Sequence, residues 1–124
     1  MKRLREELEE ILKKDNRYKI DAYLFLFEAL DYTRRLFKKR KHVTGQELLE
    51  GIKELARIKF GRMAKTVLED WGVKTTDDFG EIVFNLVEAK ILSKTRKDKK
   101  EDFHNVYSFD EVFVRDYEIK PNER

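Results

Sequence analysis

Few residues of this chain have the types and spacing that catalysis or metal binding requires. The two histidines, His42 and His104, lie far apart in the sequence, and neither has a second ligand at a zinc-binding spacing. The absence of cysteine excludes thiolate catalysis, disulfides and cysteine-ligated metals. The nucleophile elbow of serine hydrolases and the glycine-rich loops that hold nucleotide phosphates are also missing. The sequence therefore predicts no catalytic residue, metal site or cofactor, and a protein that is not an enzyme.

An acidic group at residues 77–81 is the nearest approach to acid–base chemistry. Asp77, Asp78 and Glu81 lie where a helix is predicted to begin. Carboxylates in a first helical turn stabilise the free N–H groups and the positive end of the helix dipole. Because no partner nucleophile is visible in the sequence, we expect these acids to stabilise the helix start instead of catalysing a reaction.

Basic residues gather in two segments, and the chemistry they could perform is phosphate binding. The segment RRLFKKRK (34–41) holds six cations and no acid, and 94–100 holds five cations and one acid. Such residues can contact a nucleic-acid backbone without reading its sequence. The candidate contacts are Arg34, Arg35, Lys38, Lys39, Arg40, Lys41, Lys94, Arg96, Lys97, Lys99 and Lys100. Two structural explanations stay open: cations favour a helix C-terminus, and an exposed turn is often kept soluble by charge.

Helical periodicity of apolar residues dominates the chain up to about residue 89. Asp21 is the predicted N-cap of the second helix, and Thr44 with Glu47 forms the pattern of a capping box. Trp71 could stack on a base, but beside Gly72 at a helix end it is expected in the core. The predicted helices are 2–14, 21–39, 44–60, 62–71 and 75–89.

The stretch from Thr75 to Phe109 organises the predicted fold. After its helix, residues 91–95 and 103–109 are rich in β-branched and aromatic side chains, and the polar residues between them indicate a turn. The fold class predicted is mostly α with a C-terminal β-hairpin (α+β), winged-helix-like, with about five helices. Residues 1–119 would form one domain, and 120–124 a frayed polar tail.

The charges on the helix before the predicted hairpin argue against the usual winged-helix mode of DNA binding. In that mode this helix enters the major groove and presents hydrogen-bond donors. The positions expected to be exposed here are Asp77, Asp78, Glu81, Asn85 and Glu88. Because such a surface would repel a duplex, the basic wing and the basic end of the second helix remain as the candidate contacts.

Composition sets broader bounds. The chain of 124 residues has 28 basic and 25 acidic residues, so its net charge of +3 gives weak support for a polyanion partner. No apolar run suggests a signal peptide or a membrane span, and the expected location is the cytoplasm. Abundant Lys and Glu, with few Gln, Ser and Met, favour a thermophilic source.

Four blocks of sequence resemble a family of small, uncharacterised bacterial proteins. The blocks are HVTGQELLEGI (42–52), FGRMAKTVLEDWGV (60–73), DFGEIVFNLVEAKILSKTRKD (78–98) and EDFHNVYSF (101–109). Together they cover more than half of the chain in a fixed order. The resemblance implies a helix-rich domain and brings no activity, substrate or catalytic residue with it.

Two function classes follow from these observations. The leading hypothesis is a non-enzymatic regulatory or nucleic-acid-associated protein that makes non-specific backbone contacts through the two basic segments. The alternative is a protein–protein interaction module or homodimer without nucleic-acid binding. Its contact would be the acidic face of the fifth helix or an aromatic patch made of Phe84, Tyr107, Phe109 and Phe113. A small-molecule enzyme would require a deep pocket with converging polar groups.

Overall fold

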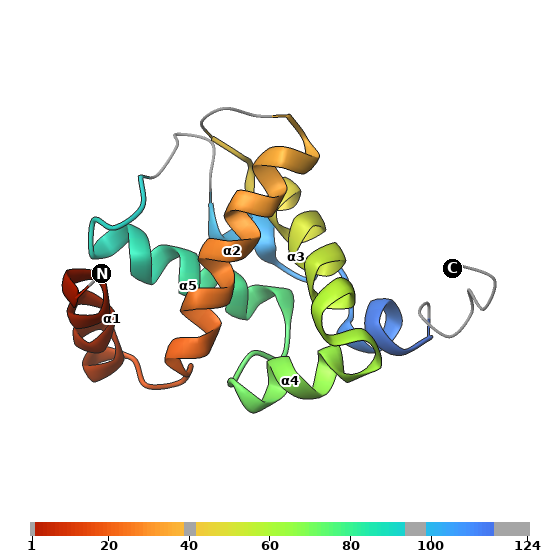
Figure 1. Cartoon of the computed structure of the whole chain (residues 1–124), viewed down its shortest axis with the longest axis horizontal. Coiled ribbons are helices and arrows are strands. Elements are labelled where there is room, and N and C mark those ends of the chain that lie inside the picture. Colours follow the sequence, from red (N-terminus) through yellow and green to blue (C-terminus); the bar gives the residue numbers. More distant parts are fainter. Residues whose placement is uncertain (1, 39–41, 94–98, 116–124) are drawn as a thin grey trace.

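The structure is a computed structural model, and it describes residues 2–38, 42–93 and 99–115 (Figure 1). All regular elements in these ranges are helical. The elements are α1 (Lys2–Lys14), α2 (Ile20–Leu36), α3 (Gly45–Phe60), the 3₁₀ turn η1 (Gly61–Met63), α4 (Ala64–Asp70), α5 (Thr76–Glu88), the 3₁₀ turn η2 (Lys100–Phe103) and the π-helical turn η3 (Asp110–Arg115). None of the helices described has the length and apolar character needed to cross a bilayer.

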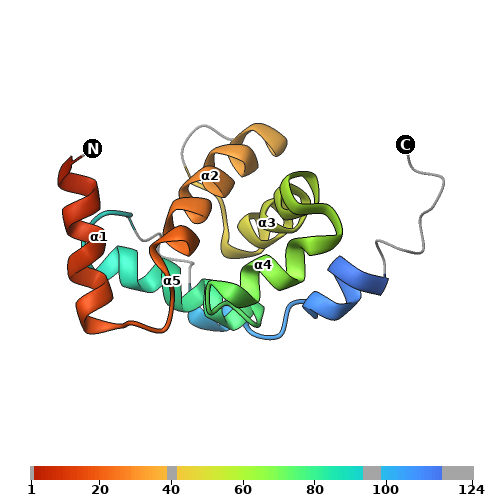
Figure 2. The ribbon, with the colours of Figure 1, turned by 60° about the horizontal axis from the view of Figure 1, so that its bottom comes forward.

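Helices α2 and α3 form an antiparallel pair at the centre of the molecule. Helix α5 crosses α2, and α1 lies beside the C-terminal end of α5 (Figures 1 and 2). The pair can approach closely because Gly51 of α3 faces Thr33 of α2. Thr33 is fully buried, and its hydroxyl donates to the carbonyl of Ala29, 2.6 Å away. A polar side chain is thus satisfied within its own helix where the two helices are in close contact.

Local capping signals explain where several helices begin and end. The capping box of α3 is confirmed: the Glu47 amide donates to the Thr44 hydroxyl at 3.0 Å, and the Thr44 amide donates to the Glu47 carboxylate at 2.9 Å. Helix α2 differs from its prediction, since Lys19 is its N-cap and Asp21 lies in its first turn. It ends at Leu36, and Lys38 follows with a φ of 56°, a left-handed conformation that stops the helix.

Trp71 is partly buried and packs against the core, so the prediction of a core position holds in part. Its ring centroid is 5.7 Å from those of Phe25 and Phe60, and these two rings are 5.8 Å apart. The three rings join α2, the end of α3 and the end of α4. Met63, which ends the turn η1, is 56% exposed.

One cluster of buried side chains runs through the described helices and turns. Members that are fully enclosed come from both ends of the chain, so the molecule has a continuous core. The largest of them are Tyr18, Tyr23, Phe79, Phe103, Phe113, Leu8, Leu26, Leu49, Ile52, Leu68, Ile82 and Leu86.

The predicted C-terminal β-hairpin, and with it the winged-helix-like α+β fold, is wrong: the described residues contain no strand. After α5 the amides of Ile91 and Leu92 both donate to the carbonyl of Leu86, which closes the end of the helix. Phe103 lies in a 3₁₀ turn, and the amide of Val106 donates to the hydroxyl of Thr76 at 3.1 Å. The intervening residues 94–98 lie outside the described part of the chain.

The physical reason is that the aromatic residues of 103–109 fill the helical core. The Phe103 ring packs against two glycines, and a Cβ on Gly45 or on Gly80 would come within 2.9 Å of its side chain. Tyr107 donates from its hydroxyl to the carbonyl of Leu49 at 2.7 Å. Aromatic and β-branched content indicates burial as well as strand, and here burial against α3 and α5 takes the place of sheet pairing.

Candidate functional site

A pocket of about 280 Å³ opens where the end of α2, the start of α3 and the second half of α5 meet. Residues after α5 and the turn η2 close its remaining sides. The lining is Leu30, Arg34, His42, Val43, Thr44, Gly45, Leu48, Val83, Phe84, Val87, Ile91, Leu92, Ser93 and Phe103. Most of these side chains are apolar, and the polar ones come from segment ends.

The polar lining residues give the pocket its chemical character. Arg34 contributes a positive charge, while His42 and Ser93 contribute exposed polar groups. The first turn of α3 adds the partial positive charge of a helix N-terminus, although the Thr44 hydroxyl is already engaged in the capping box. The combination of an apolar interior and cationic surroundings suits a ligand with an apolar body and an anionic group.

The first predicted basic segment reaches this pocket through Arg34. Arg35 is next to it and forms an ion pair with Asp31, with Nη2 and Oδ2 2.5 Å apart. Lys38 is exposed just after the end of α2. The other predicted contacts of this segment, Lys39, Arg40 and Lys41, lie outside the described residues.

The second basic segment reaches the same pocket through Lys100. Its Nζ lies 5.9 Å from the ring centroid of Phe84, a lining residue, and 3.3 Å from the Glu81 carboxylate. Lys99 is exposed, and its amide donates to Asp102 at 3.1 Å to start the turn η2. Lys94, Arg96 and Lys97 lie outside the described residues. One cation of the first segment thus lines the pocket, and one of the second lies beside a lining residue.

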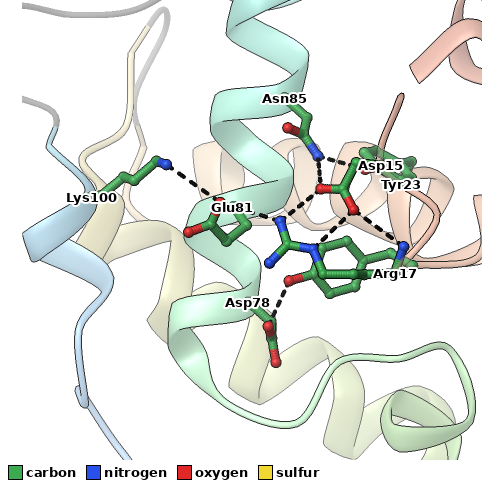
Figure 3. A network of polar contacts seen from close by, with 8 residues as sticks. Asp15, Arg17, Tyr23, Asp78, Glu81, Asn85 and Lys100 are labelled. Atoms are coloured by element: carbon green, nitrogen blue, oxygen red, sulfur yellow. Dashed lines mark hydrogen bonds and ion pairs between the residues drawn. The ribbon is translucent and has the colours of Figure 1, made fainter. Parts of the chain in front are cut away.

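A network of polar contacts covers the other side of α5 (Figure 3). The Arg17 guanidinium donates twice to Asp15, from Nε at 2.9 Å and from Nη2 at 2.7 Å. The same Nη2 lies 3.4 Å from the carboxylate of Glu81, which also accepts from Lys100. Glu81 thus lies between a cation from the α1–α2 connection and a cation from the turn η2.

The remaining contacts of the network join the α1–α2 connection to α2 and α5. The Asn85 amide donates to Asp15 and to the Tyr23 hydroxyl, both at 3.0 Å. Tyr18 is buried, and its hydroxyl donates to Asp78 at 2.5 Å. The hydrogen bonds from Arg17 hold the pKa of Asp15 well below its usual range, against the opposing effect of burial. Burial, followed by the bond to Asp78, raises the pKa of Tyr18 above its ordinary value.

Asp77 anchors the segment that follows η2. Its carboxylate accepts from the Asn105 amide at 3.0 Å and lies 2.9 Å from His104 Nδ1. Asp78 also accepts from the amides of Lys74 and Thr75 at the start of α5. These acids stabilise the helix start, as the sequence predicts, and they bind other parts of the chain as well.

The expected exposure of the polar face of α5 needs correction. Glu88 is exposed, but Asp77, Asp78, Glu81 and Asn85 are half-buried and have partners within the chain. Sequence reasoning missed Arg17 and Tyr18 because their partners lie some sixty residues away. Among the described residues, no group of three or more His, Asp or Glu side chains is placed to hold a metal ion.

Comparison with known proteins gives no match. No family model matches the chain, and neither a curated protein nor a solved structure matches it. The resemblance to a bacterial family accordingly stays a prediction, and the function has to be argued from the site itself.

Proposed function

We propose that this protein is a non-enzymatic binding protein that contacts the phosphate backbone of nucleic acid without sequence specificity. Its contact surface, here named the basic edge, consists of Arg34, Arg35, Lys38, Lys99 and Lys100. One observation carries the proposal: Arg34 lines the pocket, and Lys100 lies over Phe84 in the wall of the same pocket. Two cations from segments more than sixty residues apart in the sequence therefore lie in the pocket wall or next to one of its residues.

Local charge supports this function more than the net charge does. A net charge of +3 gives little long-range attraction, so binding must depend on how the cations cluster. Arg35 and Lys100 are paired with carboxylates in the free protein. Exposed ion pairs of this kind contribute only about 0–1 kcal/mol, so a phosphate can replace the carboxylate at small cost.

The direct test is a salt series. A fluorescently labelled duplex and a single strand, each as DNA and as RNA, are titrated with the protein between about 20 mM and about 300 mM salt. Binding is expected to be tightest at the lowest salt, with the logarithm of the affinity falling linearly with the logarithm of the salt concentration. Absence of binding to all four at the lowest salt would overturn the proposal.

A charge variant locates the contact. Arg34→Gln, Arg35→Gln and Lys38→Gln combined remove three cations from the basic edge, and each lost phosphate contact lowers the salt slope by about 0.9 for duplex DNA. The matched control combines Lys59→Gln, Lys65→Gln and Lys74→Gln, because Lys59 lies in the last turn of α3, Lys65 lies on α4, and none of the three lines the pocket. The edge variant should lose both affinity and slope, whereas the control should stay close to the parent protein.

The alternative function, a protein–protein module or homodimer, has less support from the described residues. Phe109 and Phe113 are 3% and 1% exposed, so they cannot contribute to an aromatic patch on the surface. Most polar residues of α5 have partners within the chain, as described above. A dimer in solution with no affinity for nucleic acid would favour this alternative, and sedimentation at several concentrations measures it.

A further inference from the structure

We propose that the pocket beside the basic edge receives one unstacked base of a single strand, so that the protein prefers single-stranded nucleic acid to duplex. This inference rests on the proposed function, because phosphate contacts bring the strand to the pocket. It goes further by naming the form of nucleic acid and the part of it that is recognised.

The interior of the pocket suits a flat aromatic group. Its wall includes Phe84, which is half-buried, and the apolar side chains of Val83, Val87 and Leu92. The volume of about 280 Å³ lies just below the range of roughly 300–1,000 Å³ that is typical of small-ligand pockets. Aromatic side chains bind bases by stacking, and this interaction tolerates any base because every base has a π face.

Charge complementarity identifies the occupant as a nucleotide of a strand. An isolated apolar ligand would make no favourable contact with the nearby cations, whereas a nucleotide within a strand has a phosphate on each side of its base. With a base inside the pocket, its phosphates would lie at the opening, where Arg34 comes from one segment and Lys100 from another. The start of α3, a helix of 16 residues, adds positive potential at the same opening.

The same geometry explains why a duplex should bind less tightly. In a duplex every base is paired and stacked, so a base can enter the pocket only after it is extruded, which costs free energy. A single strand has unpaired bases available at lower cost. The Thr44 hydroxyl accepts from the Glu47 amide and is engaged in the capping box, and stacking on an aromatic ring does not discriminate between bases. We therefore expect a preference for single strands with little sequence preference.

The first experiment separates base binding from phosphate binding. The probes are a labelled oligothymidylate of roughly twelve nucleotides, the same strand paired with oligoadenylate, and an abasic strand with the same number of phosphates. Stacking of one base changes affinity by roughly 5- to 150-fold, so the thymidine strand should bind tighter than the abasic strand by a factor in this range. Equal affinities would overturn the inference.

The second experiment fills the pocket. Val83→Phe introduces a larger side chain at a half-buried lining position, and Val67→Phe on α4 is the matched control at a half-buried position away from the pocket. Val83→Phe should lower the affinity for the thymidine strand to that for the abasic strand and leave the latter unchanged. Val87→Phe replaces it if circular dichroism shows that Val83→Phe does not fold.

A third measurement needs no variant. A strand carrying 5-iodouracil is cross-linked by light to the parent protein, and mass spectrometry maps the attachment. Attachment is expected at Phe84 or at His42, and attachment confined to sites outside the pocket lining would contradict base binding in the pocket.

The outcomes distinguish this inference from the function on which it rests. If no strand binds at low salt, the proposed function fails and the base pocket fails with it. If the two single strands and the duplex bind equally and Val83→Phe has no effect, phosphate binding stands and the base pocket is wrong. Only a preference for the thymidine strand that is lost in Val83→Phe supports both.

Discussion

The hydroxyl of Thr76 donates a 2.7 Å hydrogen bond to the carbonyl of Phe103 and accepts one of 3.1 Å from the amide of Val106. Thr76 is fully buried in the first turn of α5. One side chain thus satisfies two backbone groups of a segment that would otherwise need a neighbouring strand. This contact helps to explain why residues 103–109, although rich in strand-forming side chains, form no strand.

We expect Thr76→Val to destabilise the protein by about 2 kcal/mol, since it keeps the shape of the side chain but leaves the Phe103 carbonyl and the Val106 amide without a partner. Urea denaturation followed by circular dichroism measures the free energy of unfolding. Thr66→Val, at an exposed position on α4, is the control and should have a small effect. Equal stabilities of the two variants would contradict the role given to Thr76.

A second prediction concerns the contact between α2 and α3. Gly51→Ala places a methyl group against the Thr33 side chain, so the helices must separate, and overpacking of this kind costs about 1–3 kcal/mol. Adding Thr33→Ala removes the hydroxyl oxygen that lies nearest to the new methyl group and should restore part of the lost stability. Thermal unfolding of the two single variants and the double variant gives the coupling, and strictly additive effects would show that the two residues do not compete for space.

Asp15 should make the stability depend on acid pH. Its pKa is lowered in the folded protein by the hydrogen bonds from Arg17, so its contribution is fully present above about pH 4, the usual value in an unfolded chain. The contribution decreases as the pH falls below that value, because the folded state then resists protonation that the unfolded state accepts. Asp15→Asn should therefore lower stability at neutral pH and flatten its decrease between about pH 5 and pH 2.

The control for this prediction is Asp70→Asn, which removes an exposed carboxylate that contacts Lys19. Denaturation midpoints at several pH values compare the parent protein with both variants. An Asp15→Asn variant that loses stability in acid as steeply as the parent would show that this carboxylate is not responsible.

Tyr18 should make the stability of the folded protein decrease at alkaline pH, whereas Asp15 acts at acid pH. Burial and the bond to Asp78 raise its pKa in the folded protein, so its contribution is fully present below about pH 10 and is lost as the pH rises further. Tyr18→Phe should cost about 1 kcal/mol at neutral pH, because one hydrogen bond is lost and Asp78 keeps its two amide donors. The loss of stability above about pH 10 should be smaller in this variant, as alkaline denaturation curves would show.

Trp71 supplies a prediction without a mutation. Its ring packs against Phe25 and Phe60, so its fluorescence should report on folding and should not change when an oligonucleotide binds at the basic edge. Titration with the single strand at low salt, with binding confirmed by anisotropy, provides the comparison. Strong quenching at saturation would show that bases stack near α4 instead.

Short-range signals in the sequence are enough to predict the helices, but they do not predict the structure of the segments that connect them. Thr44 and Glu47 are three residues apart, and their capping box follows from local pattern alone. The segment 103–109 has strand-like composition, but its partners Thr76 and Leu49 are 27 to 58 residues away. No local rule distinguishes a strand from an aromatic segment that fills a helical core.

The candidate site shows the same division. The cations at 34–41 stand out by composition, whereas the pocket beside Arg34 depends on the packing of α2, α3 and α5 and could not be predicted. The acids of α5 are predicted to face solvent because their charged side chains lie between the apolar positions of the helix. That inference is sound for an isolated helix, but Tyr18 and Arg17 cover the same face in the folded chain.

The position of Glu81 has a thermodynamic consequence. This carboxylate is shared by Arg17 and Lys100, which belong to segments at opposite ends of the sequence. A phosphate that attracts Lys100 competes with Glu81, and Glu81 is then left to Arg17. If phosphate binds at the basic edge as proposed, its affinity and the strength of the Arg17–Glu81 contact are linked, and by reciprocity each acts on the other by the same coupling free energy.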